Sequence, residues 1–346
     1  MNSFEYDYFL DQPISQKILI AVRTLGEYKG KEILYKEQFP EVLKTLQQAS
    51  IIQSTESSNR IEGIIVPENR IRMIVAQKAK PQNRPEEEVA GYKDILNEIH
   101  TNFGRHNLSS KLILKWIKDL YKYTPEKVAG YKTEDNAILE ILPSGKTVVR
   151  FRPLSAQETP AAINKLCSMY NKNIKDKKIE PLLAVASFVL DFECIHPFKD
   201  GNGRIGRLLT LLLLYQVGYE VGRFISLERI TEESKEAYYD ALYKSSQNWN
   251  KGEHDLIPWW DYFLSMLIAA YKEFEERVGY ITTAKGAKRE LVFAAIDKLP
   301  DEFSFSDVQR ACPGVSFSTI KRALQELKAK KIIKSTGKGR DAKYRK

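Results

Sequence analysis

The 346-residue sequence contains only three cysteines and four histidines. Cys167, Cys194 and Cys312 form no Cys-x-x-Cys pair, so we expect reduced thiols and neither a disulfide framework nor a structural zinc site. The longest apolar run, near residues 208–215, is far shorter than the roughly 20 residues of a membrane-spanning helix. The first ten residues carry acids and no basic region, which argues against a signal peptide. These absences predict a cytoplasmic protein with no membrane contact.

The positive charge is concentrated at one end of the chain, whose formal net charge is +9. Residues 321–346 hold eleven Lys or Arg and two acidic residues, so positions 1–320 are balanced, with 43 of each sign. Such a basic segment is typical of a surface that binds an anionic partner, nucleic acid first, although a solvated tail has the same composition.

Helical periodicity dominates most of the sequence. Apolar residues recur at helical spacing in segments 14–25, 41–50, 86–99, 110–121, 181–195, 208–217, 232–246 and 257–278. The segment 208–217 is apolar on nearly all sides, which places it in the core. The exception is 133–152, where AILEIL, the turn signal Pro-Ser-Gly and TVVRF predict a β-hairpin. We therefore expect a mainly α fold with one hairpin.

A second pattern begins near residue 286. Helices are predicted at 288–298, 306–312 and 318–328, and KIIKSTGKGRDAKYRK ends the chain with two short extended pieces. Three helices followed by a basic ribbon are the order of a winged helix-turn-helix domain. Lys321 and Arg322 on the predicted recognition helix, with Lys338 and Arg340 on the ribbon, would contact DNA or an acidic protein. The chain is thus divided into an N-terminal helical region (1–95), a core (96–280) and a winged helix domain (286–346).

A Gly-x-Gly-x-x-Gly pattern lies inside IHPFKDGNGRIGR at residues 195–207. A dinucleotide-binding turn needs a strand that runs into its first glycine, here Gly201, but the flanking segments are helical on both sides. A plain turn between two helices would explain Gly201, Asn202 and Gly203. It would not explain the charged residues that surround them.

Those charged residues favour a phosphate site. Amides at the start of a helix favour an anion, and Arg204 and Arg207, three residues apart, share a helix face. Asp200 would repel phosphates unless it binds Mg²⁺, which proteins hold with one or two carboxylates plus phosphate oxygens. His196 can act as a general base near neutral pH. The combination predicts phosphoryl or nucleotidyl transfer.

HPFKDGNGRIGR resembles, letter for letter, the core motif of Fic proteins, HPFx[D/E]GNGRxxR. The resemblance covers roughly residues 10–275 and implies a helical Fic core with a β-hairpin flap. It also implies transfer of AMP from ATP to a Ser, Thr or Tyr hydroxyl of a target protein. The hairpin at 133–152 would be the flap, whose free edge aligns a target segment by strand addition. The resemblance implies that His196 is the base, that Phe198 anchors the loop and that Asp200 binds Mg²⁺. It also implies that Gly201, Asn202 and Gly203 form an anion hole for the α- and β-phosphates. Arg204 and Arg207 would contact the outer phosphates, with Arg207 on the γ-phosphate.

SNRIEG at residues 58–63 is similar to the inhibitory pattern of the family, [S/T]xxxE[G/N]. The resemblance implies that Glu62, one turn after Ser58, pairs with Arg207 and competes with the γ-phosphate. The same letters also suit an ordinary helix end capped by Gly63.

Tyr238 and Tyr239 resemble the tyrosine pair on the adenine side of the Fic site, although two core aromatics would give the same sequence. Several relatives place Asn seven residues after the second tyrosine, and Ser246 stands there.

We therefore expect an autoinhibited protein adenylyltransferase that uses ATP and Mg²⁺. A DNA-binding regulator whose Fic core senses nucleotide is one alternative, and AMP removal, with Glu62 positioning water, is another. Because sensing needs neither a base nor a metal ligand, His196 and Asp200 favour catalysis. Fic proteins often pair through their cores, so a homodimer is also open.

Overall fold

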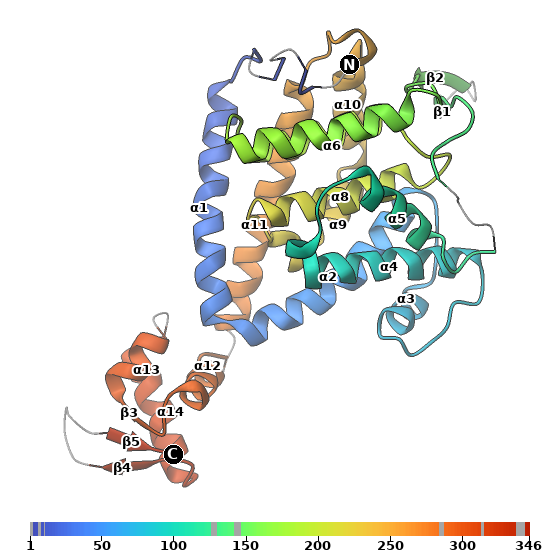
Figure 1. The fold of residues 1–346 in the computed structure, drawn as a ribbon. Coiled ribbons are helices and arrows are strands. Elements are labelled where there is room, and N and C mark those ends of the chain that lie inside the picture. The colour runs from blue at the N-terminus through green and yellow to red at the C-terminus, as the bar shows by residue number, and fades with distance from the viewer. Residues whose placement is uncertain are drawn as a thin grey trace. The chain divides into compact units, whose positions relative to one another are not determined.

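The computed structural model describes residues 3–5, 8–9, 11–125, 130–141, 147–283, 287–312, 315–336 and 343–346. Most of these residues lie in helices (Figure 1), so the expected mainly α fold is confirmed. The chain divides into two compact units, one of Met1–Gly30 with Leu46–Lys272 and one of Lys31–Thr45 with Glu273–Lys346. The described part of the chain contains no helix long and apolar enough to cross a membrane. The predicted limits of the N-terminal helical region (1–95), the core (96–280) and the winged helix domain (286–346) stay predictions.

Two apolar helices form the centre of the first unit. α7 (Pro181–Ile195) and α8 (Asn202–Gln216) pack against each other, and nearly all their side chains are buried. Around them, α6 (Thr159–Asp176) and α10 (Lys235–Ser246) contact α7, while α4 (Arg84–Asn102) and α5 (Ser110–Leu120) contact α8. The other helices in the first 283 residues are α1 (Gln16–Gln38), α2 (Pro40–Ile61), α3 (Glu68–Val75), α4 (Arg84–Asn102), α5 (Ser110–Leu120), α6 (Thr159–Asp176), α9 (Leu227–Glu233), α10 (Lys235–Ser246) and α11 (Ile257–Thr283), with 3₁₀ turns at Phe103–Arg105, Val221–Arg223 and Trp249–Lys251.

α4 and α5 cross at very short range beside α8. A Cβ atom built on Gly91 would overlap the carbonyl of Leu120, so only glycine fits this crossing. Both helices begin at a side-chain cap. The side chain of Asn83 accepts from the N–H of Glu86 at the start of α4, and the hydroxyl of Ser109 accepts from the N–H of Leu112 at the start of α5. The caps and the crossing together fix which side of this pair faces α8.

The predicted hairpin is present. β1 (Ile138–Ile141) pairs antiparallel with β2 (Thr147–Phe151), and the Pro-Ser-Gly turn lies outside the described residues. Arg150 of β2 ties the hairpin to α10, since Nη2 donates to the carbonyl of Tyr239 at 2.9 Å and the guanidinium lies over the ring of Tyr243. The hairpin is therefore fixed to the helices that carry the tyrosine pair.

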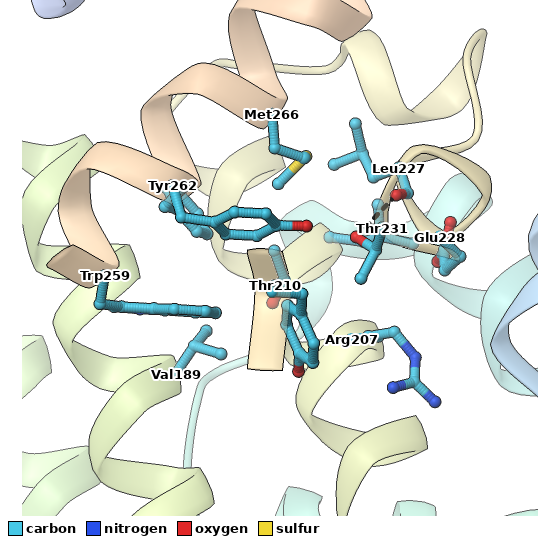
Figure 2. A pocket seen from close by; sticks show the side chains of 12 residues that line it. Val189, Arg207, Thr210, Leu227, Glu228, Thr231, Trp259, Tyr262 and Met266 are labelled. Atoms are coloured by element: carbon cyan, nitrogen blue, oxygen red, sulfur yellow. Dashed lines mark hydrogen bonds between the residues drawn. The ribbon is translucent and has the colours of Figure 1, made fainter. Parts of the chain in front are cut away.

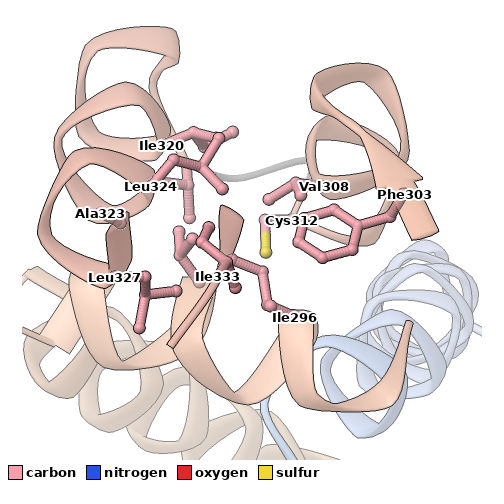
Figure 3. Close-up of a cluster of buried hydrophobic side chains, with 11 residues drawn as sticks. Ile296, Phe303, Val308, Cys312, Ile320, Ala323, Leu324, Leu327 and Ile333 are labelled. Atoms are coloured by element: carbon pink, nitrogen blue, oxygen red, sulfur yellow. The ribbon is translucent and has the colours of Figure 1, made fainter. Parts of the chain in front are cut away.

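The second unit also contains short helices and strands at the C-terminal end of the chain. Among the described residues these are α12 (Ala287–Lys298), β3 (Glu302–Ser304), α13 (Phe305–Ala311), α14 (Phe317–Ala329), β4 (Lys334–Thr336) and β5 (Lys343–Arg345). The strands form an antiparallel sheet in the order β3-β5-β4, and a core of its own holds the unit together (Figure 3). Ser304 and Asp307 form a capping box at the start of α13. The three helices and the last two strands lie where the sequence predicted them and β3 was not predicted, while the assignment of this region as a winged helix stays a prediction.

Several elements differ from the sequence expectations. α1 and α2 extend well past the predicted ends at residues 25 and 50, because their further turns carry charged residues that hide the apolar period. α6 was not expected, although Ile163, Leu166 and Tyr170 are buried at helical spacing. The predicted helix 232–246 is two helices, α9 and α10, that meet at Ser234.

Candidate active site

The loop between α7 and α8 is folded around two side chains. His196 ends α7 in the left-handed conformation, with φ of 49°, and its N–H donates to the carbonyl of Phe192 at 2.9 Å. Asn202 closes the loop, because Oδ1 accepts from the N–H of Phe198 at 2.9 Å and Nδ2 donates to the Phe198 carbonyl at 2.8 Å. Phe198 is fully buried and stacks beside Tyr131. The loop is thus rigid before any substrate arrives.

The N-terminus of α8 has the geometry of the predicted phosphate cradle, whose role stays a prediction. The first N–H groups of a helix have no acceptor within it and lie at the positive end of its dipole. α8 begins at Asn202, after Gly201 with φ of 86°. The amide of Gly201 is engaged within the loop, since it donates to Oδ1 of Asp200 at 2.7 Å. The amides of the first turn, from Asn202 and Gly203 onwards, are the donors that suit an anion here.

Asp200 stands at the mouth of this cradle, and 59% of its side chain is exposed. Its Oδ2 accepts from the hydroxyl of Tyr121 at 2.7 Å and lies 3.6 Å from Nη2 of Arg204. Among the described residues, no group of three His, Cys, Asp or Glu side chains could hold a metal ion alone. One exposed carboxylate fits Mg²⁺ that arrives with phosphate oxygens and water, and does not fit a metal held by protein ligands only.

The imidazole of His196 borders a cavity of about 210 Å³. Burial lowers the pKa of His196 to about 4, against the raising effect of the Glu193 backbone, and Lys132 lowers it further. The ring is therefore neutral at pH 7 and can accept a proton. Glu62, Gly203, Arg207, Tyr238 and Tyr239 line the same cavity, together with the hairpin residues Ile138, Arg150 and Phe151.

Arg207 is held by α2. Its Nη2 donates to Oε1 of Glu62 at 2.8 Å and to the carbonyl of Ser58 at 2.9 Å, while Nε donates to Oγ of Ser58 at 2.8 Å. Only 8% of the Arg207 side chain is exposed. Burial alone would lower the pKa of this guanidinium, but the charge of Glu62 and the nearby tyrosines outweigh it and raise the pKa. The Glu62–Arg207 pair expected from the sequence is confirmed as a contact.

Arg204 lies elsewhere, inside the protein. Its side chain is 1% exposed, Nη1 donates to Oε2 of Glu88 at 2.6 Å, and Nη2 donates to the hydroxyl of Tyr121 at 2.7 Å. Asn59 of α2 lies 3.5 Å from the same Nη1. Arg204 does not line the cavity beside His196, so contact with a phosphate would require these bonds to be exchanged. Its predicted role stays a prediction.

Residues 107–214, which include this loop, α7, most of α8, α5 and the hairpin, match the Fic/DOC family. The chain contains a Fic domain. Proteins with this domain commonly transfer nucleotidyl groups to proteins and generally use ATP with a metal ion.

Known proteins similar to the chain agree with this assignment. A Fido domain-containing protein of Dictyostelium discoideum is 40% identical over 65 residues, which are 18% of this chain and 46% of that relative. The match thus spans less than half the length of the relative. Among solved structures, a Fic family protein from Desulfovibrio desulfuricans has a TM-score of 0.64 at 21% identity and covers 96% of both chains.

Two further structures extend the likeness of fold. A Fic domain containing signaling protein from Bacteroides thetaiotaomicron has a TM-score of 0.60 at 22% identity, over 75% of this chain and 98% of that chain. Fic-1 from C. elegans has a TM-score of 0.59 at 17% identity, over 78% of this chain and 74% of that chain. At these identities the structures support the fold alone.

The tyrosine pair lies on α10 and borders the cavity, and its contact with adenine stays a prediction. Tyr238 is buried, meets Tyr239 edge-on at 5.1 Å between ring centroids, and packs against Trp259. Ser246 lines the same wall of the cavity. Tyr238 thus combines the two alternatives left by the sequence, because it is both a core aromatic and a lining residue.

A second, smaller cavity lies behind Arg207 (Figure 2). Its volume is about 30 Å³, which is room for about one water molecule, and its walls are mostly apolar. Figure 2 shows the guanidinium of Arg207 at the edge of this cavity, opposite Trp259. It is too small for a nucleotide.

Lys132 and Asn136 hold the loop between α7 and α8 by hydrogen bonds. The sequence gave no reason to choose either residue. Lys132 donates from its backbone to the carbonyl of Pro197 at 2.9 Å, and from Nζ to the carbonyl of Ile195 at 3.1 Å. Asn136 accepts from the same Nζ at 2.9 Å and donates to the carbonyl of Phe198 at 3.4 Å. Burial lowers the pKa of Lys132 to about 8. Glu88 and Tyr121, the partners of Arg204, were also unexpected, because buried charges have no local sequence pattern.

The predicted DNA-contacting residues belong to the second unit. Lys321 and Arg322 are exposed on α14, whereas Ile320 and Leu324 on the same helix are buried. Lys338 and Arg340 lie outside the described residues.

Proposed function

We propose that this Fic domain protein is an autoinhibited protein adenylyltransferase. The observation that carries the proposal is the meeting of a neutral His196, the N-terminus of α8 and Arg207 on one cavity, with Glu62 of the same chain on Arg207. A base, an anion cradle and a cation for outer phosphates are the parts that nucleotidyl transfer needs.

In the proposed reaction, the amides of the first turn of α8 hold the α-phosphate of ATP. His196 takes the proton from the hydroxyl of the target protein, and the hydroxyl oxygen bonds to the α-phosphorus. The bond between the α-phosphorus and the bridging oxygen breaks, and pyrophosphate leaves. Mg²⁺ at Asp200 would neutralise charge on the phosphates. Tyr238, Tyr239 and the hairpin would enclose the nucleoside, since they form the apolar wall of the same cavity.

The same geometry accounts for the proposed inhibition. Arg207 would bind the γ-phosphate, but its Nε and Nη2 donors are already used by Glu62 and Ser58. An Arg–carboxylate pair is a direct competitor of an Arg–phosphate pair. ATP would therefore bind weakly or in an unproductive pose until α2 releases Arg207.

The target would dock on the hairpin at 133–152. The hairpin has only two described strands, and Val149 of β2 is 45% exposed. A strand of the target could pair with a free edge and bring its hydroxyl towards His196. Pairing of two chains through the Fic domain is also part of the proposal, and light scattering would test it.

Labelled ATP with Mg²⁺ tests the adenylyltransferase. The wild type should label itself or a target weakly, Glu62→Gly strongly and His196→Ala not at all. Glu56→Gly is the matched control, because Glu56 lies on α2 but pairs with Arg60 instead. If Glu62→Gly stays silent with every nucleoside triphosphate, the proposed function is wrong. If Glu62→Gly abolishes release of AMP from a modified protein, the reverse reaction is the activity.

A second function is supported by the charge of the second unit. The whole excess of positive charge lies in residues 321–346, and Lys321, Arg322 and Lys328 are exposed on α14. A basic helix face of this kind suits the major groove of duplex DNA.

Salt dependence tests the DNA proposal. Because phosphate contacts release counterions, affinity for duplex DNA should fall steeply as the salt concentration rises. Lys321→Ala should reduce the slope of log affinity against log salt concentration by about one. Deleting residues 285–346 should abolish binding and leave the ATP chemistry intact. DNA binding that survives this deletion would contradict the assignment.

A further inference from the structure

Glu193 is a carboxyl of the active site for which the motif gives no role. It lies on α7, one turn before His196, and 13% of its side chain is exposed. Its Oε1 is buried and has no hydrogen-bond partner among the described residues. Its Oε2 lies 4.0 Å from Nδ1 of His196. A buried carboxyl without a partner loses the hydration that it has in water, so this position has a cost in the free protein.

The fold makes room for this carboxyl. A Cβ atom built on Gly206 of α8 would overlap Oε1 of Glu193, so glycine at 206 is what allows the side chain to lie there. Glu193 also lines the same cavity as His196 and Arg207. The third glycine of the Gly-x-Gly-x-x-Gly pattern therefore has a specific function, which is to leave space for Glu193.

His196 also has a ring nitrogen without a hydrogen-bond partner among the described residues. Its Nδ1 is buried and no described residue makes a hydrogen bond of normal geometry with it. A histidine that acts as a base through Nε2 must carry its proton on Nδ1, and a neighbouring acceptor fixes that tautomer. Hydrogen bonds of catalytic groups are often long in free enzymes and shorten when substrate binds. The 4.0 Å approach of the two side chains fits such a bond before substrate has arrived.

We propose that Glu193 is a positioning residue that acts through His196. Its carboxylate accepts the Nδ1–H and directs the Nε2 lone pair at the target hydroxyl. When Nε2 takes the hydroxyl proton and pyrophosphate leaves the α-phosphorus, the imidazolium keeps its Nδ1–H on the carboxylate, which balances the new charge. This role rests on the proposed adenylyltransferase function.

Two other groups compete for the same contacts. The backbone carbonyl of Glu193 lies near the ring and could fix the tautomer without the side chain. Arg207 attracts the carboxylate of Glu193, whereas Glu62 repels it. A substitution that removes the carboxylate and keeps the backbone separates the first alternative from the proposal.

The test uses the full chain in the Glu62→Gly background. Glu193→Gln should reduce kcat at least about tenfold and leave KM for ATP within about twofold, because general-base steps contribute about a hundredfold or more. Glu193→Asp, which keeps a carboxylate, should recover part of the rate. Glu220→Gln is the control, since Glu220 is a partly exposed carboxyl that pairs with Arg223 outside the cavity.

An independent readout separates this inference from the function on which it rests. Nitrogen-15 NMR of labelled histidine should show His196 protonated at Nδ1, with this tautomer lost or its pKa changed in Glu193→Gln. If the parent Glu62→Gly variant is inactive, the proposed function fails, while the NMR experiment still decides the contact. If the parent is active and both Glu193 variants match it in rate and in the His196 signals, the inference is overturned. If Glu193→Gln does not fold, Glu193→Asp decides: a reduced rate with a shifted His196 signal supports it, and no change in either overturns it.

Discussion

Oε1 of Glu62 lies 2.8 Å from Nη2 of Arg207, so the residue that directly follows α2 occupies the last arginine of the Fic motif on α8. Ser58 accepts two further bonds from Arg207, one at its hydroxyl oxygen and one at its carbonyl oxygen. Arg207 is thus held at three points, and only one of them is the carboxylate proposed to be inhibitory. Because two bonds remain when Glu62 is removed, Arg207 should stay near its present place and still be able to turn to a phosphate.

Ser58→Ala should release the inhibition only in part. The substitution removes the bond from Nε of Arg207 and leaves both bonds from Nη2. A lost bond to a charged group costs about 1.5–3 kcal/mol, but Glu62 still competes with the γ-phosphate. Initial labelling rates with ATP should rise above the wild type and stay below Glu62→Gly. Ser57→Ala, at the neighbouring buried serine, is the control. A rate equal to that of Glu62→Gly would mean that Ser58, not Glu62, is the main brake.

Gly206→Ala should impair catalysis although alanine favours helices by about 1 kcal/mol. The added Cβ would displace the carboxyl of Glu193. In the Glu62→Gly background we expect kcat to fall at least about tenfold with ATP binding kept, as for Glu193→Gln. Stopped-flow or labelling kinetics measure kcat, and calorimetry measures ATP binding. Full activity in a folded Gly206→Ala variant would show that the position of Glu193 does not matter.

Gly91→Ala should lower the melting temperature. Its Cβ would meet the backbone of Leu120, which cannot turn aside as a side chain can. Overpacking of this kind costs about 1–3 kcal/mol, so α4 and α5 should separate slightly. Gly26→Ala on α1 is the matched control, because nothing lies within 4 Å of a Cβ there. The control should be neutral or slightly stabilising. Equal melting temperatures for both variants would contradict the close crossing.

The rate of the activated variant should depend on pH through Glu193 rather than His196. Burial raises the pKa of Glu193 to about 7, opposed by Arg207 of α8 and assisted by Glu62 just after α2, whereas burial lowers the pKa of His196 to about 4. Between pH 6 and 8 His196 stays neutral while Glu193 ionises, so kcat should rise with pH.

Comparison with Glu193→Gln isolates this effect from titration of ATP and of Lys132, since both are present in each reaction. The rise should be smaller in the variant than in its parent when kcat is measured at saturating ATP. In the Glu62→Gly background the repulsion from Glu62 is absent, so the midpoint should lie lower than in the intact chain. Identical profiles for parent and variant would exclude the Glu193 carboxylate as the source.

Much of the Fic loop could be predicted from the sequence because its interactions are local. His196, Phe198 and Asn202 lie within seven consecutive positions, and the bonds that close the loop join them directly. The hairpin was predictable for the same reason, since strand and turn signals lie side by side. The Glu62–Arg207 contact came only from the resemblance, because no local rule joins residues so far apart in the chain.

The supporting residues of the site could not be predicted. Glu88 reads as one more acid on a charged helix, yet it is buried against Arg204. Lys132 and Asn136 reach the loop only because the chain returns to it after α5. Long-range pairing of buried charges depends on how helices pack, and neither periodicity nor spacing carries that information.

His196 ends α7 in a left-handed conformation, which non-glycine residues adopt at a cost of about 1–2 kcal/mol. Glycine is the residue that a helix end of this shape favours. A screen of variants for heat resistance alone would therefore tend to select glycine at position 196 and discard the proposed base without any sign of damage to the fold. Under the proposed mechanism, the most thermally robust version of this protein and its active version need different residues at the same place.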